Sequence, residues 1–182
     1  MIAAVVTLGG PPGSGKSTAG RRVASALDLE FRSAGELFRA EARRQGMDLE
    51  AFGRFASHHP EVDRELDRTM QALAAPGRLL EGRVQGPLCR RAGRPVYDVV
   101  VTAREDVRVH RVAERDGEPV DVARRKVRDR EQVERERYLT FYGIDVEREP
   151  AGVVVDSSDR SPGAVADAIL AYIAEREAAV GR

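Results

Sequence analysis

The residues with the clearest chemistry form one short segment near the N-terminus. Residues 10–18 read GPPGSGKST and contain the pattern G-x-x-x-x-G-K-[ST], with an apolar run before it and a helical pattern after it. Glycines in such a turn let backbone N–H groups converge on phosphate oxygens, and the start of a helix adds a positive partial charge. The segment predicts a nucleoside triphosphate site rather than a glycine-rich turn with a chance lysine. The expected triphosphate-binding residues are Gly10, Pro11, Pro12, Gly13, Ser14, Gly15, Lys16, Ser17 and Thr18.

Two side chains of this segment have distinct expected roles. Lys16 can reach the β- and γ-phosphates, and the Ser17 hydroxyl can ligate Mg²⁺. Lysine is rare in this chain, because only Lys16 and Lys126 among its 30 basic residues are not arginine. A compact ammonium on a flexible stem approaches phosphate differently from a planar guanidinium. A lysine at this position of an arginine-rich chain therefore supports the phosphate-binding interpretation.

The length and composition limit the classes of protein that the chain can be. Its 182 residues, 42% of them hydrophobic, fit one globular domain with its own core. The 30 basic and 30 acidic residues cancel, which argues against a nucleic-acid partner held by a general basic field. No apolar run is long enough for a membrane span, and the single cysteine fits a reducing compartment. We expect a cytoplasmic monomer that acts on small molecules.

Apolar runs and helical patterns alternate along the chain, which indicates a parallel sheet with crossover helices. Five strands are expected, at residues 2–8, 30–32, 78–81, 96–102 and 152–155. Helices connect them, including a long charged helix over 119–141 and a last helix that starts at Ser161-Pro162. The expected fold is a three-layer α/β domain with two helical excursions.

Charged side chains follow two of the expected strands. Arg39 lies one helical turn beyond Ser33-Ala34-Gly35, after the second strand, and Glu81-Gly82-Arg83 ends the third strand. Ligands of open parallel sheets bind at the carboxyl ends of the strands. A guanidinium fork matches phosphate, so Arg39 and Arg83 are candidates to hold a second phosphate group, and Glu81 can orient Mg²⁺ through its water shell. The alternative for Arg39 is an ordinary solvated helix residue.

The charged helix over 119–141 has two interpretations. Its alternating charges fit a solvated helix with i,i+4 ion pairs, such as Arg130–Glu134 and Glu131–Arg135. However, Arg130 and Arg137 are seven residues apart on one face, and Arg115 ends the preceding helix. Three such arginines can close over a transferring phosphoryl group as a lid that excludes water.

Several motifs occur along the chain in an order typical of one enzyme family. They are Gly10–Thr18, Ser33–Arg39, Gly46–Glu50, Pro60–Asp67, Leu80–Arg83, Thr102–Arg115, Arg137-Tyr138 and Tyr142–Asp145. Through them the chain resembles the P-loop nucleoside monophosphate kinases over nearly its whole length, and most closely the short archaeal-type cytidylate kinases. The resemblance implies transfer of the ATP γ-phosphoryl group to CMP or dCMP, with Mg²⁺, giving ADP and CDP or dCDP.

The resemblance also implies a division of the domain and roles for its residues. It implies a monophosphate-binding helical subdomain over 35–75, which contains Asp63 and Asp67, and a helical lid over 115–148. The expected catalytic residues are Lys16, Arg83, Arg115, Arg130 and Arg137. The expected substrate-binding residues are Ser33, Gly35, Arg39, Asp63, Asp67, Gly82, Arg83 and Gln85, and the expected metal ligands are Ser17 and Glu81.

The identity of the acceptor stays open at this stage. Bacterial cytidylate kinases carry an Asp directly after the Gly-Arg pair that reads the cytosine edge, whereas this chain has Val84, followed by Gln85 with an amide that can donate and accept. AMP, UMP or a modified cytidylate therefore remain alternative acceptors. A nucleotide-binding switch is less favoured because no Asn/Thr-Lys-x-Asp guanine-reading motif occurs. An RNA-binding module is disfavoured because acids cancel the basic residues of 124–137. His58 and His59 are expected to be surface residues without a catalytic role.

Overall fold

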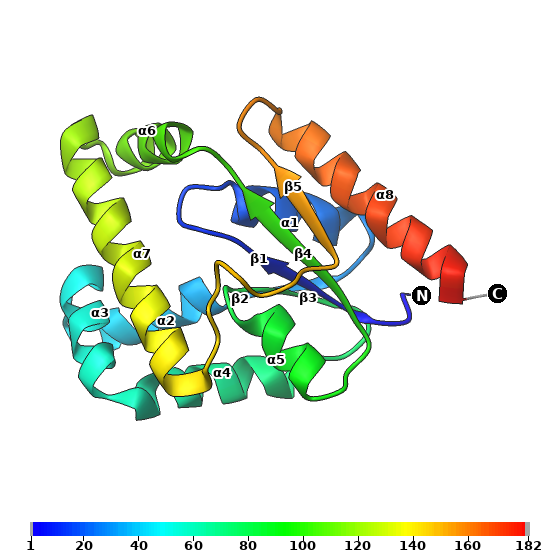
Figure 1. The fold of residues 1–182 in the computed structure, drawn as a ribbon, viewed down its shortest axis with the longest axis horizontal. Coiled ribbons are helices and arrows are strands. Elements are labelled where there is room, and N and C mark those ends of the chain that lie inside the picture. The colour runs from blue at the N-terminus through cyan, green and yellow to red at the C-terminus, as the bar shows by residue number, and fades with distance from the viewer. Residues whose placement is uncertain (1, 181–182) are drawn as a thin grey trace.

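One parallel β-sheet forms the centre of the computed structural model, which describes residues 2–180 (Figure 1). Its strands lie in the order β2-β3-β1-β4-β5. Their bounds are β1 Val5–Gly9, β2 Glu30–Ser33, β3 Arg78–Glu81, β4 Val96–Thr102 and β5 Val153–Asp156. The expected five-stranded parallel sheet is confirmed, and the third and fourth strands have the expected bounds.

The central strand brings the chemically interesting segments together. All five residues of β1 are buried, as expected for a parallel strand covered on both faces. Leu8 of β1 pairs with Glu81 of β3, and Gly9 pairs with Val100 of β4. The glycine-rich turn after β1 therefore leaves the sheet beside Glu81-Gly82-Arg83.

Helices cover both faces of the sheet and extend beyond one end of it (Figure 1). Their bounds are α1 Lys16–Ala26, α2 Ala34–Arg44, α3 Leu49–His58, α4 Pro60–Ala72, α5 Gln85–Arg91, α6 Glu105–Asp116, α7 Val120–Tyr142 and α8 Pro162–Val180. The main core lies between the sheet and α1 and α8, with Val23 and Ile169 fully buried. A second cluster, which includes Met70 and Leu80, covers the other face together with α4 and α5.

The two helical excursions meet through α7. The first, α2–α4, is held by aromatic contacts, since the rings of Phe38 and Phe52 are 4.6 Å apart and those of Phe55 and His59 are 3.9 Å apart. The second is the pair α6 and α7, which shares a small apolar cluster that includes Val109 and Val127. Helix α7 extends from α6 to α3, so it bridges the two excursions (Figure 1).

Several local expectations differ from the structure. β1 begins at Val5 rather than residue 2, because residues 3 and 4 form a bend before the sheet. The expected pair Glu131–Arg135 is replaced by tertiary pairs, because Glu131 bonds Arg108 of α6 at 2.6 Å and Arg135 bonds Asp145 at 3.0 Å.

Helix α5 was not expected from the sequence, and two arginines at its end and just after it, Arg91 and Arg94, bond to other helices. Arg91 donates to the carbonyl oxygens of Tyr142 and Gly143 at the end of α7, at 2.6 and 3.1 Å. Arg94 does the same for α4, with its Nη1 2.8 Å from the oxygen of Gln71. Guanidinium groups are favourable at helix C-termini, so these arginines fasten two helices to the sheet. Within residues 2–180, no helix is long and apolar enough to cross a membrane.

Candidate active site

The glycine-rich turn fits closely against β4 and α6. Gly10 has φ 137° and Gly13 has φ 77°, a region that favours glycine. A Cβ at Gly10 would lie 2.0 Å from the carbonyl oxygen of Val101, and one at Gly13 would lie 2.5 Å from that of Arg108. The hydroxyl of Ser14 is buried and has no hydrogen-bond partner among the described residues. The turn therefore combines a backbone shape that only glycine permits with an unsatisfied polar atom, which fits a phosphate cradle.

The rest of the motif lies on the first turn of α1. Gly15 is its N-cap residue and Lys16 its first residue, followed by the exposed Ser17 and Thr18. The Nζ atom of Lys16 donates to the carbonyl oxygen of Pro11 at 3.2 Å. The carbonyl oxygen of Pro12 accepts from Arg108 at 3.3 Å, which fixes the turn against α6.

Lys16 also faces the end of β3. Its Nζ lies 3.8 Å from Oε1 of Glu81. Burial lowers the pKa of Lys16 to about 8, while the negative charge of Glu81 opposes this shift. The ammonium group therefore keeps its charge at neutral pH.

The Glu81 carboxylate is fixed from the other side by Ser33. The Ser33 hydroxyl donates to Oε2 of Glu81 and accepts from the backbone N–H of Glu36. The structure thus uses Ser33 to hold Glu81. Ser17, the residue after Lys16, and Glu81, whose carboxylate lies 3.8 Å from the Lys16 ammonium, supply the hydroxyl and carboxylate oxygens that Mg²⁺ prefers. This donor set fits a magnesium ion that takes its other ligands from phosphate and water.

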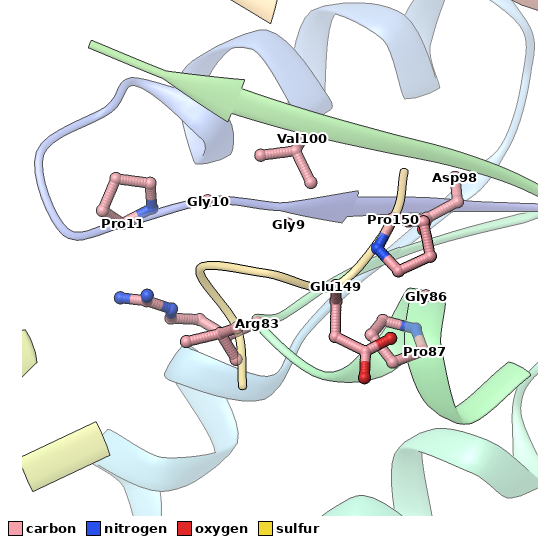
Figure 2. Close-up of a pocket in the computed structure, with 11 residues that line it drawn as sticks. Gly9, Gly10, Pro11, Arg83, Gly86, Pro87, Asp98, Val100, Glu149 and Pro150 are labelled. Carbon is pink, nitrogen blue, oxygen red and sulfur yellow. The ribbon is translucent and has the colours of Figure 1, made fainter. Parts of the chain in front are cut away.

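Arg83 reaches the same place from the loop after β3. A small cavity of about 50 Å³ lies between the ends of β1 and β4 and the start of α5, and Arg83 lines it together with Gly10, Asp98 and Glu149. Figure 2 shows the Arg83 side chain extending toward the Pro11 side of this cavity, away from Glu149. Nucleotide pockets are typically about 300–1,000 Å³, so this cavity is too small for a nucleotide. The residues that line this cavity show that Arg83 lies beside the glycine-rich turn.

Other arginines approach from the helical excursions. Arg39 is half-buried; burial lowers its pKa, and the positive charge of Arg130 lowers it further. The positive charge of Arg130 also acts on Arg115, whose guanidinium donates a hydrogen bond to Asp116 at 2.7 Å. The structure therefore brings together five of the expected cations, from five different segments. They are Lys16, Arg39, Arg83, Arg115 and Arg130.

The two expected glycines differ in how closely they are packed. A Cβ at Gly82 would lie 2.9 Å from the Cβ of Ala34 and 3.0 Å from Cγ of Gln85, so Gly82 allows a close approach of these residues. A Cβ at Gly35 would lie 3.4 Å from Nη1 of Arg39, which is an ordinary contact distance and shows that this guanidinium lies beside Gly35.

Arg137 does not join the cations at the glycine-rich turn. Its Nε and Nη2 atoms donate to the two carboxylate oxygens of Asp63 in α4, both at 2.8 Å, and it is only 5% exposed. Its guanidinium lies 5.0 Å from the ring centre of Phe38. Seven residues advance a helix by about 10 Å, so Arg137 reaches α4 whereas Arg130 reaches the turn. The expected position of Arg137 over a phosphoryl group is therefore corrected: it clamps α7 to α4.

Asp67 and Gln85 form one polar network at the junction of α4, α5 and α7. The Gln85 amide donates to Oδ1 of Asp67 at 2.7 Å and accepts from Gln71 at 2.8 Å. The Tyr142 hydroxyl donates to Oδ2 of Asp67 at 2.8 Å. The amide orientation of Gln85 is thereby fixed, with one N–H still unassigned by these bonds.

Comparisons with known proteins agree with this site. A family described as an AAA domain matches residues 6–139. The cytidylate kinase of Archaeoglobus fulgidus is 38% identical over 144 residues, which cover 78% of this chain and 78% of that protein. The cytidylate kinase of Pyrococcus horikoshii is 36% identical over 171 residues, which cover 93% of this chain and 88% of that protein. The chain belongs to the cytidylate kinase family. It is a P-loop nucleoside monophosphate kinase, as its sequence motifs predicted, and its substrates are small nucleotides.

The fold of this cytidylate kinase family member is shared more widely. A solved structure of shikimate kinase from Acinetobacter baumannii has a TM-score of 0.61 and 19% identity, and the match covers 96% of this chain and 94% of that one. At this identity the likeness concerns the fold alone. It confirms the expected α/β architecture of a P-loop kinase.

One residue of the kinase site was missed by the sequence interpretation. The sequence predicted an ion pair between Glu134 and Arg130 on the surface of a solvated helix. The structure contains that pair, with Nε of Arg130 donating to Oε1 of Glu134 at 2.7 Å. However, Glu134 is only 8% exposed and also bonds Arg83, at 3.3 Å. The i,i+4 spacing in the sequence indicated the pair with Arg130. It could not indicate the second partner, Arg83, which lies 51 residues away in the chain.

Asp67 gives the kinase a pH-dependent stability. Burial raises its pKa to about 6, against the effect of hydrogen bonds from Tyr142 and Gln85. The folded state then binds more protons than the unfolded state between about pH 4 and pH 6, so this group destabilises the fold as pH rises through that window. We expect Asp67→Asn to gain up to about 3 kcal/mol in unfolding free energy relative to wild type between pH 4 and pH 8.

Urea unfolding across this pH range measures the difference. Asp129→Asn is the matched control, because Asp129 is an exposed carboxylate on α7 and its variant should follow the wild-type curve. A constant difference between Asp67→Asn and wild type at all pH values would contradict the prediction.

Proposed function

We propose that this kinase transfers the γ-phosphoryl group of ATP to CMP or dCMP with Mg²⁺. The reaction breaks the bond between the γ-phosphorus and its bridging oxygen, which leaves with ADP, and forms a bond to a phosphate oxygen of the acceptor. The observation that carries the proposal is the convergence of three cations beside the phosphate loop: Lys16 belongs to that loop, Arg83 lines a cavity with Gly10, and Arg130 shares the Glu134 carboxylate with Arg83. The acceptor oxygen is already anionic, so no strong general base is needed.

The donor side of the proposed site is the phosphate loop. The backbone N–H groups of the non-proline residues of the loop, among them Gly13 and Gly15, and the ammonium of Lys16 would bind the ATP phosphates, while Ser17 and Glu81 would hold Mg²⁺. When bound, Mg²⁺ supplies positive charge that neutralises the phosphate oxygens. Arg115 and Arg130, in the lid proposed over 115–148, stabilise the charge of the transferring group and help to exclude water.

The acceptor side of the proposed site is the subdomain over 35–75 and the start of α5. Arg39 and Arg83 orient the acceptor phosphate through their guanidinium forks. The Asp67 carboxylate, held in place by the fully buried Gln85, can accept from an exocyclic amino group. Cytosine presents such an amino group, whereas uracil presents a carbonyl in its place. In this proposal the network around Asp67 recognises the cytosine edge, which the apolar side chain of Val84 cannot do.

A coupled ADP-release assay with ATP, Mg²⁺ and a panel of CMP, dCMP, UMP, AMP and GMP tests the proposal. We expect turnover of CMP and dCMP, with kcat/KM for UMP lower by about 10²-fold or more because mismatched polar groups would be buried. Rapid turnover of another monophosphate would keep the reaction and change the acceptor. Folded, ATP-binding protein that is inactive with the whole panel would overturn the proposal.

A further inference from the structure

Glu134 is a buried carboxylate in the middle of α7 that lies among cations of the proposed active site. Its Oε1 accepts from Nε of Arg130 at 2.7 Å, and its Oε2 accepts from Nη1 of Arg83 at 3.3 Å. Its charge also acts on Lys16. One carboxylate thus links the helix that carries Arg130 to the loop after β3, across 51 residues of sequence.

This arrangement differs from an ordinary surface ion pair. An exposed i,i+4 pair contributes only about 0.3–0.5 kcal/mol, because water screens the charges. Burial alone would raise the pKa of Glu134, yet Arg130 and Arg83 outweigh it and lower that pKa to about 2. The carboxylate is therefore ionised at any physiological pH. Its charge offsets the repulsion that would otherwise separate three clustered cations.

The bonds to Glu134 leave most of each guanidinium group available. Among the described residues, the guanidinium groups of Arg83 and Arg130 have no hydrogen-bond acceptor other than Glu134. Each guanidinium carries five N–H donors, so the remaining donors can face phosphate oxygens. Because the Glu134 carboxylate binds one edge of each guanidinium group, it also fixes the direction in which the remaining N–H donors of that group point.

We propose that Glu134 is a positioning residue that holds Arg83 and Arg130 as one unit. Arg83 belongs to the acceptor side of the proposed site and Arg130 to the proposed lid. Because both bond to Glu134, the position of the lid and the orientation of the acceptor phosphate are coupled. This inference rests on the proposed phosphoryl transfer but not on the choice of acceptor base. Because aligned reactants matter most in the transition state, the loss of Glu134 affects kcat more than KM.

Glu134→Gln tests the proposal, since it keeps the shape of the side chain and removes its charge. We expect kcat to fall about 10- to 100-fold, with the KM of both nucleotides changed less than about threefold. Glu134→Asp keeps the charge on a side chain shorter by one methylene, and should recover part of kcat. Glu136→Gln is the matched control, because Glu136 is exposed on the same helix and bonds only Gln132 among the described residues.

A double-mutant cycle separates positioning from a general weakening of the fold. In an Arg83→Ala background, Glu134→Gln should lower kcat much less than in wild type, because half of the unit is already lost. Thermal unfolding of each variant verifies that the assays use folded protein. Wild-type kcat for Glu134→Gln, equal losses in Glu134→Gln and Glu134→Asp, or additive losses in the cycle would each overturn the proposal.

The wild-type assay distinguishes this result from a failure of the proposed function. If the acceptor panel yields an acceptor other than CMP, the variants are compared with wild type on that acceptor and the inference about Glu134 is tested unchanged. If wild type transfers no phosphoryl group to any acceptor, the proposed function fails and the inference about Glu134 fails with it.

Discussion

Lys16→Ala is expected to lower kcat by at least about 10³-fold and to leave the fold intact. The Lys16 ammonium lies between the phosphate loop and Glu81, where the transferring phosphoryl group is proposed to pass. Phosphoryl transfer depends on positioning and charge neutralisation, so a lost cation at this point weakens transition-state binding directly. Among residues 2–180 the Lys16 side chain makes one hydrogen bond and one longer ion pair, so we expect its removal to leave the fold largely unchanged.

Two further variants make this result specific. Lys126→Ala removes the other lysine of the chain, which pairs with Glu118 on the outer side of α7, and should keep wild-type turnover. Lys16→Arg retains the charge but replaces a flexible ammonium by a planar fork, and should stay strongly impaired. Steady-state ADP release and circular dichroism measure rate and fold. Lys16→Ala with more than a tenth of the wild-type kcat would exclude the proposed mechanism.

The sequence predicted best what is encoded locally. The phosphate loop is specified by glycine spacing within nine residues, and β3 and β4 by short segments with adjacent apolar residues, Leu79-Leu80 and Val99–Val101, so these elements lie where they were expected. Helix α5 was missed because it has only seven residues, of which Gln85, Gly86, Pro87 and Cys89 are buried. A short helix buried in this way shows no helical periodicity in its sequence.

The partners of charged residues could not be predicted in the same way. The spacing of Arg130, Glu134 and Arg137 shows that they share one side of a helix, but not which elements pack against that side. Arg83 and Asp63, which decide the roles of Glu134 and Arg137, are 51 and 74 residues away. Only the tertiary packing of α7 against α6 and α3 determines that one arginine reaches the phosphate loop and the other a buried carboxylate of α4.

Arg137→Ala is expected to destabilise the fold by about 3–5 kcal/mol, because it leaves the buried Asp63 carboxylate without a partner. Both side chains are only 5% exposed, and both carboxylate oxygens accept from Arg137. Arg135→Ala is the matched control on the same helix. Arg135 is 39% exposed and pairs with Asp145 and Glu147, so its loss should cost less than about 1 kcal/mol.

The cost of Arg137→Ala should depend on Asp63 and on pH. Burial already raises the pKa of Asp63, and Arg137 opposes that shift. Without Arg137 the carboxyl takes up a proton more readily in the folded state, so the variant should lose less stability at about pH 5 than at about pH 8. In the double variant Asp63→Ala/Arg137→Ala neither charge of this pair remains, so its unfolding free energy should exceed the value expected from adding the two single losses. Urea unfolding of wild type, the two single variants and the double variant measures this coupling free energy between Asp63 and Arg137. Additive losses, or a loss independent of pH, would show that the clamp between α4 and α7 does not depend on this ion pair.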